Sequence, residues 1–68
     1  MNIHPLIGQP VEGYRIIAAE SVGHDVTVVL AAKGSSWCTW RRVGAVYVFP
    51  VYHSDFWSAF KNYRRRCN

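Results

Sequence analysis

Residues 26–33 read Val26-Thr27-Val28-Val29-Leu30-Ala31-Ala32-Lys33, and this stretch decides the fold class. Its β-branched residues favour an extended backbone. Side chains alternate between the two faces of a strand, which places Val28 and Leu30 on one face and Val29 and Ala31 on the other. The stretch therefore predicts a β-strand, and segments of turn composition bound it at 21–25 and at 34–36.

Three more strands are predicted on either side of this one. They cover residues 14–20, 37–42 and 46–52, and a short connection at 43–45 joins the last two. Short turns between consecutive strands make the neighbours antiparallel. Pro50 has no backbone N–H to donate, so the 46–52 strand either lies at an edge of the sheet or ends near Pro50.

A helix is predicted after the last strand. Ser54 or Asp55 can cap its first turn with a side-chain oxygen. The spacing of the apolar residues then changes from two to about 3.6, which is typical of a helix with one buried face. That face consists of Phe56, Ala59, Phe60 and Tyr63.

The predicted fold class is therefore α+β, with a four-stranded antiparallel sheet in ββββα order and one C-terminal helix packed on one face. A chain of 68 residues has room for a single core, so residues 1–68 are expected to form a single domain. It divides into an extended lead-in over 1–12, the antiparallel sheet over 13–53 and the helix over 54–66.

Composition and charge suggest a binding surface. Half of the residues are hydrophobic and 15% are aromatic, which argues against disorder and exceeds what a small core needs. The net charge of +4 is uneven, because residues 1–32 carry −2 and residues 33–68 carry +6. A basic half favours an acidic partner. The alternative is that the charge only keeps an apolar protein soluble.

The cysteines and the apolar runs bear on the compartment. Cys38 and Cys67 do not form a dense disulfide framework, and residues 1–5 do not begin a signal peptide. The longest apolar run, 45–52, is far shorter than the roughly 20 residues that cross a membrane. We therefore expect a cytoplasmic protein with no membrane partner and with reduced thiols, Cys38 buried and Cys67 exposed.

No catalytic, cofactor or metal motif is found. The run His53-Ser54-Asp55 places adjacent residues side by side, whereas the members of a catalytic triad converge from separate parts of a fold. Cys38, His53 and Cys67 lack the spacing of a zinc site. The glycines stand singly, without a phosphate-binding run. The protein is therefore predicted not to be an enzyme and to need no cofactor.

Four segments carry a resemblance to a known class of proteins, namely 14–17, 26–33, 37–42 and 49–60. An aromatic-Thr-Trp-basic strand is followed there by an aromatic strand, a capping Ser-Asp pair and a short helix. This order resembles small uncharacterised ββββα accessory proteins of phages and mobile elements. The resemblance implies a non-enzymatic binding protein, and inhibitors of bacterial defence systems such as anti-CRISPR proteins are the sharpest class within it.

The alternation of residues 37–42 predicts which face binds. We expect Cys38 and Trp40 in the core under the helix, which leaves Trp37, Thr39 and Arg41 facing outward. Tryptophan and arginine are enriched at binding hot spots. The alternatives are that residues 1–12 cover Trp37 and that the terminal arginines are merely solvated. The predicted partner-binding residues are Trp37, Arg41, Arg42, Lys61, Arg64, Arg65 and Arg66.

The partner predicted for these residues is an acidic protein surface or a protein–nucleic acid complex. Nucleic acid itself is the alternative partner, because tryptophan stacking and arginine–phosphate contacts bind single strands. A third alternative is a homodimer formed through the edge strand that holds Pro50.

Overall fold

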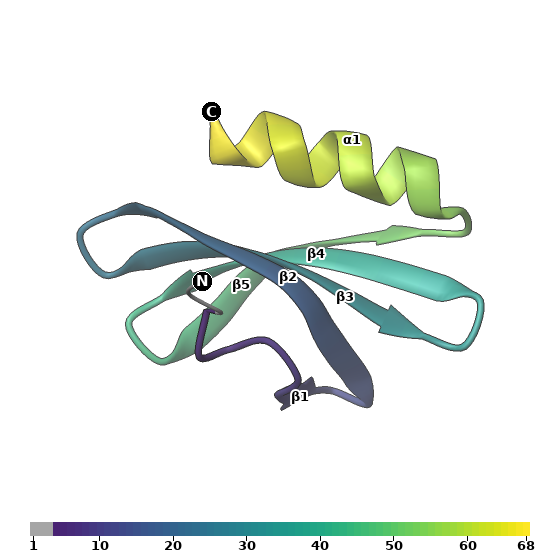
Figure 1. Cartoon of the computed structure of the whole chain (residues 1–68), viewed down its shortest axis with the longest axis horizontal. Coiled ribbons are helices and arrows are strands. Elements are labelled where there is room, and N and C mark those ends of the chain that lie inside the picture. The colour runs from purple at the N-terminus through teal and green to yellow at the C-terminus, as the bar shows by residue number, and fades with distance from the viewer. Residues whose placement is uncertain (1–3) are drawn as a thin grey trace.

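The computed structural model of the protein describes residues 4–68, which form five strands and one helix. These elements are β1 (Pro10–Val11), β2 (Tyr14–Gly23), β3 (Val26–Lys33), β4 (Ser36–Val43), β5 (Val46–His53) and α1 (Phe56–Cys67). The strands form one antiparallel sheet in the order β1-β2-β3-β4-β5, and α1 lies across one face of it (Figure 1). The α+β class and the C-terminal helix are thus confirmed.

The sheet has five strands and not the predicted four. The extra strand, β1, comes from the segment predicted as an extended lead-in, of which residues 1–3 lie outside the described residues. Val11 pairs with Tyr14 across a tight turn in which Glu12 and Gly13 both have positive φ, 49° and 85°. Pairing with β2 and burial of Val11 hold this two-residue strand in place.

The strands run longer than the sequence predicted. β3 covers the predicted residues, but β2 continues to Gly23 through a segment expected to be a turn. Two residues suffice for each turn between the strands from β2 to β5, because Asp25, Gly34 and Gly44 take positive φ near 60°. The residues on either side of each turn therefore remain paired.

Pro50 lies in an edge strand, as predicted, because β5 has β4 as its one neighbour among the strands of residues 4–68. The register of this pair shifts between Thr39 and Arg41, opposite the stretch where Phe49 takes a φ of 54°. Pro50, which has no backbone N–H, thus lies where the pairing of β5 with β4 is already irregular. The strand therefore continues past it to His53.

The helix begins at Phe56 because Asp55 caps it. The Asp55 carboxylate accepts hydrogen bonds from the backbone N–H groups of Trp57 and Ser58, at 3.0 and 3.3 Å. These bonds satisfy two of the free donors of the first turn. The predicted inward face is confirmed, since all four of its residues pack in one cluster against the sheet, namely Phe56, Ala59, Phe60 and Tyr63.

Both faces of the sheet are buried, each in its own cluster. On the helix side, Val28 and Leu30 pack with Ala59 and Tyr63. The opposite cluster consists of Val11, Ile16, Val29, Ala31, Cys38 and Trp40, with Leu6 and Tyr14 packed against it. Cys38 and Trp40 are therefore core residues, as predicted, but the expectation that they lie under the helix is wrong.

The expectation that Trp37 and Thr39 face outward is also wrong. Thr39 pairs with Leu30 and so shares its face, where it is fully buried and donates a hydrogen bond to the side-chain oxygen of Asn62 in α1. Trp37 is half-buried on the same face, edge-on to Phe56 with ring centroids 6.3 Å apart. Phe56 of the helix thus packs on Trp37 at this face.

Aromatic rings close the face away from the helix. Trp40 is at the centre, with the ring of Tyr14 at 5.6 Å and those of Tyr47 and Tyr52 at 6.3 Å. The rings of Tyr14 and Tyr52 are 6.2 Å apart, although one lies in β2 and the other in β5. The sheet therefore curls around Trp40, and its fully buried ring is unavailable to a partner.

Candidate binding surface

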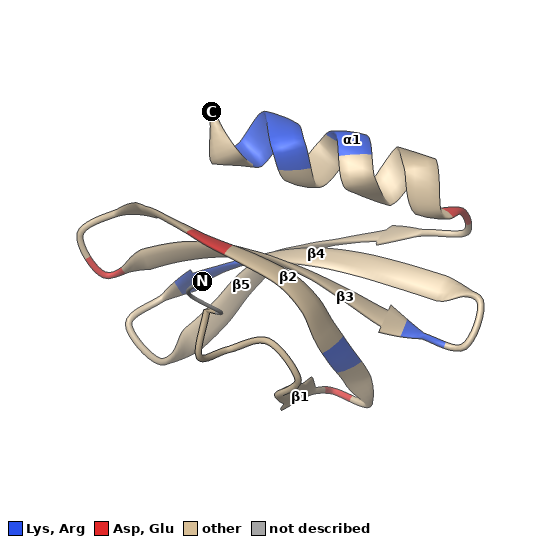
Figure 2. Ribbon diagram, in the orientation of Figure 1, with Lys and Arg blue, Asp and Glu red and all other residues tan. Residues whose placement is uncertain are grey.

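The outer face of α1 gathers one tryptophan and three cations. Its exposed residues are Trp57, Ser58, Lys61, Arg64 and Arg65. Relative to Trp57, the cations stand at i+4, i+7 and i+8, which is one side of a helix whose other side holds Ala59 and Tyr63. Trp57 is 67% exposed. Figure 2 shows the basic residues along the helix, and we call these five residues the outer helix face.

The charge of this face is not neutralised within the helix. α1 carries no Asp or Glu, and its last turn holds three arginines, Arg64 to Arg66. Cations at a helix C-terminus interact favourably with the helix dipole, so part of this placement stabilises the helix itself. Among the described residues, Lys61, Arg64 and Arg65 form no hydrogen bond to a carboxylate. Their charges are therefore available to a partner.

Arg41 and Arg66 both lie near the C-terminal end of the helix. They line a hollow of about 300 Å³ together with residues of the β2–β3 hairpin. The guanidinium of Arg66 donates from Nη2 to the Phe49 carbonyl at 2.7 Å, while its Nη1 is shielded from solvent and has no hydrogen-bond partner. Burial, and then the neighbouring charge of Arg41, lower the pKa of Arg66.

The structure separates the predicted partner-binding residues into four places. Lys61, Arg64 and Arg65 lie together on the outer helix face, and Arg41 and Arg66 line the hollow. Arg42 points to the sheet face away from the helix, where its guanidinium lies 5.6 Å from the Tyr47 ring centroid. Trp37 lies between sheet and helix. Trp37 and Arg42 thus do not share a surface with the helical cations.

Trp57 was missed by the sequence prediction, which assigned the surface tryptophan to Trp37. A signal for it was present. Once Ala59 and Tyr63 are placed on the buried face, helical periodicity puts Trp57 on the opposite face with Lys61 and Arg64.

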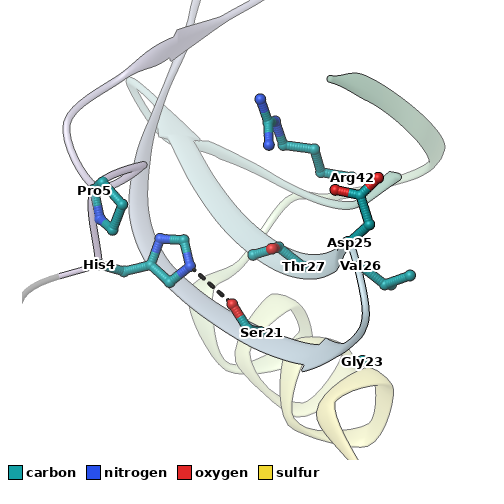
Figure 3. Close-up of a pocket in the computed structure, with 8 residues that line it drawn as sticks. All are labelled: His4, Pro5, Ser21, Gly23, Asp25, Val26, Thr27 and Arg42. Atoms are coloured by element: carbon teal, nitrogen blue, oxygen red, sulfur yellow. Dashed lines mark hydrogen bonds between the residues drawn. The ribbon is translucent and has the colours of Figure 1, made fainter. Parts of the chain in front are cut away.

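A polar hollow of about 470 Å³ lies beside the β2–β3 turn (Figure 3). His4 and Ser21 line it, and the His4 Nε2 atom is 3.2 Å from the Ser21 hydroxyl oxygen. The Nδ1 atom of His4 accepts the backbone N–H of Leu6 at 3.2 Å. A neutral ring in this geometry carries its proton on Nε2 and donates to Ser21, so it cannot take the serine proton as a general base.

The two thiols belong to different clusters. Cys38 is fully buried away from the helix, and burial raises its pKa to about 11. Cys67 ends α1 and packs half-buried in the helix-side cluster, so the expectation that it is exposed is wrong. Burial, and then the charge of Glu20, raise the pKa of Cys67. Both are free thiols on opposite faces of the sheet.

Residues 4–68 offer neither a group of metal ligands nor a helix that could span a membrane. No group of three or more His, Cys, Asp or Glu residues in this part of the chain is placed to hold a metal ion. No helix within the same residues combines the length and apolar character needed to cross a membrane.

Comparison with known proteins assigns no family. No protein-family model, no curated protein and no solved structure matches the chain. The resemblance to accessory proteins of mobile elements therefore remains a prediction from the residues alone.

Proposed function

We propose that this protein is a small non-catalytic binding protein that places the outer helix face against an acidic surface of a partner protein. One observation carries the proposal. The five exposed residues of α1 comprise one tryptophan, three cations and one serine, with no acidic residue. At protein interfaces a few buried aromatic and arginine anchors, enclosed by a polar rim, supply most of the affinity.

Trp57 is well held for such a role. The centroid of its ring lies 5.4 Å from that of Phe56 and 6.1 Å from that of Phe60, and both contacts are edge-on. Phe56 and Phe60 in turn pack against the sheet, so the exposed ring rests on a fixed base. A side chain that is already restricted loses less entropy when a partner covers it, which favours tight binding.

A protein partner fits this face better than a nucleic acid strand. Proteins that bind single strands stack several bases in succession on aromatic side chains along a groove. The outer helix face offers a single tryptophan. Nucleic acid remains the alternative, since three cations in a row also attract phosphates.

The resemblance to mobile-element proteins supports a narrower form of the proposal, in which the partner belongs to a bacterial defence system. CRISPR effectors hold their nucleic acid in a positively charged channel. A basic helix is repelled by such a channel. An inhibitor with this outer helix face would therefore contact an acidic surface of the complex.

Capture from a bacterial lysate, with matched variants as bait, tests the proposal. The parent chain, Trp57→Ala, Lys61→Gln and Arg15→Gln are immobilised after circular dichroism shows that each is folded. Arg15→Gln is the control, because it removes one charge from an exposed site on β2. We expect Trp57→Ala to weaken binding of the captured protein by about 2 kcal/mol, Lys61→Gln by less, and Arg15→Gln to match the parent.

Two outcomes contradict the proposal. Equal affinity of the parent and Trp57→Ala would show that the outer helix face is only solvated. Captured material that nuclease removes, with an affinity falling about 20- to 40-fold from roughly 50 to 200 mM salt as expected for three phosphate contacts, would indicate nucleic acid as the partner.

A further inference from the structure

A second surface lies apart from the outer helix face, in the hollow between the end of α1 and the β2–β3 hairpin. Its lining residues are Val22, Gly23, Val26, Arg41, Arg66, Cys67 and Asn68. The two charged side chains among them are both arginines. The lining therefore combines apolar and small residues with two guanidinium groups.

One hydrogen bond holds the Arg66 side chain in place, and one of its N–H groups has no acceptor. Its Nη2 atom is tied to the Phe49 carbonyl at 2.7 Å, and its Nη1 atom is shielded from solvent without a partner. An unpaired buried donor on a charged group is costly, so a rotation of the guanidinium that brings Nη1 into the hollow, where a ligand can accept the hydrogen bond, is favoured. Arg41, by contrast, is exposed and has room to turn toward a ligand.

Within residues 4–68, no Asp or Glu side chain lines the hollow beside the two arginines. Glu20 lies on the same face of the sheet, but β3 separates it from Arg41, since Glu20 pairs with Val28 and Val28 pairs with Arg41. Two strand spacings are roughly 10 Å. Glu20 acts instead on Tyr63 and Cys67, whose pKa values its charge helps to raise. The repulsion between Arg41 and Arg66 is left for an external anion to relieve.

From this arrangement we infer that the hollow binds one phosphate group between Arg41 and Arg66. A phosphate group carries a charge of about −1.5 to −2 near neutral pH and offers three or more acceptor oxygens, which matches two guanidinium forks. A carboxylate brings a single charge and satisfies one fork. The free carbonyls at the end of α1 oppose any anion, so the affinity for phosphate alone is expected to be weak.

An NMR titration with inorganic phosphate tests the inference. Ionic strength is held constant with sodium chloride, and the backbone amides of Gly23 and Asn68 report on the hollow. We expect saturable shifts in the parent. Arg41→Gln and Arg66→Gln should raise the dissociation constant about tenfold or more, since each loses a charge-assisted hydrogen bond.

Arg65→Gln is the matched control, because Arg65 is exposed next to Arg66 and loses the same charge but does not line the hollow. It should change the dissociation constant less than about twofold, since it loses only a screened charge. Arg41→Gln removes no hydrogen bond of the native chain, so it keeps the test valid if Arg66→Gln does not fold. Shifts that never saturate, or equal losses in Arg41→Gln and Arg65→Gln, would overturn the inference.

A parallel titration with O-phosphoserine identifies the source of the phosphate. Binding at least as tight as that of inorganic phosphate assigns the hollow to phosphate monoesters, and weaker binding assigns it to the free ion. Trp57→Ala should bind phosphate like the parent, because Trp57 does not line the hollow. A failure of this site is therefore distinguishable from a failure of the outer helix face.

Discussion

The hydrogen bond between Thr39 and Asn62 gives a sharp test of how α1 sits on the sheet. Thr39 is fully buried in β4, and its hydroxyl donates to the Asn62 side chain above it. Asn62 is only half-buried, so water can reach its amide if the bond is lost. The two partners therefore differ in what their removal leaves behind, and the two substitutions are predicted to have unequal costs.

Asn62→Ala should be the more damaging change. It leaves the Thr39 hydroxyl buried without an acceptor, which costs about 1–3 kcal/mol of unfolding free energy. Thr39→Val replaces the hydroxyl with a methyl group of similar shape and loses about 0.5–1.5 kcal/mol, which burial of the methyl group partly offsets. In the double variant no donor is left unpaired, so its cost should fall short of the sum by about 1 kcal/mol.

Urea unfolding of the parent, both single variants and the double variant measures these costs. Lys61→Ala, on the exposed side of the same helix, is the control and should lie within about 0.5 kcal/mol of the parent. The slope of the unfolding free energy against urea concentration must be the same in all variants for the comparison to hold. Equal costs for the two single variants, with additivity in the double variant, would mean that the helix does not dock on Thr39 as described.

Three other predictions follow from burial and capping. Cys38 should react with a thiol reagent only after urea unfolds the chain, while Cys67 should react in the folded state but more slowly than a free thiol; equal native rates would contradict the two burial states. The pKa of Asp55 is lowered by its hydrogen bonds to Ser58, so its contribution to stability is full at neutral pH and is lost as the pH falls through its folded-state pKa. Asp55→Asn keeps a cap but no charge, so its melting temperature should depend less on pH in the acid range than that of the parent, and parallel curves would refute the role of the charge. Trp37→Ala should cost about 2 kcal/mol because the side chain is half-buried, whereas Trp57→Ala should melt close to the parent; a reversal of this order would move the core to the other tryptophan.

Local signals in the sequence were enough to predict the order of the main elements. The 26–33 strand and the inward face of the helix were confirmed because alternation and helical spacing depend on neighbouring residues alone. The ends of the strands were not predicted correctly, because turn-forming residues extend over several positions at each connection. Which two of them make the turn depends on the pairing of the flanking strands.

The choice of the covered face needed tertiary information. Residues 37–42 carry large or apolar side chains on both faces, with Trp37 on one and Cys38 and Trp40 on the other. Alternation predicts two faces but does not say which one meets the helix. The same limit applies to β1, whose two residues are too few for any period and are held by pairing with β2.

The two candidate sites also differ in whether neighbouring residues alone can predict them. The outer helix face is a local feature, and helical spacing alone places Trp57 beside Lys61 and Arg64, although the sequence prediction missed it. The pair formed by Arg41 and Arg66 is not local. It exists because α1 folds back over β4 and β5, so that its last turn reaches the Phe49 carbonyl and leaves Arg66 facing Arg41.

The three tryptophans explain why binding is assigned to the outer helix face. Trp40 is fully buried in one cluster and Trp37 packs against the other, so both are used by the fold. Burial of a large aromatic side chain would stabilise a domain of 68 residues, whose core is small. Trp57 forfeits that stabilisation, because α1 meets the sheet through Ala59, whose small side chain is fully buried, and holds Trp57 on the opposite side. The free energy that its burial can still release is therefore available to a partner, and the cations beside it favour an acidic one.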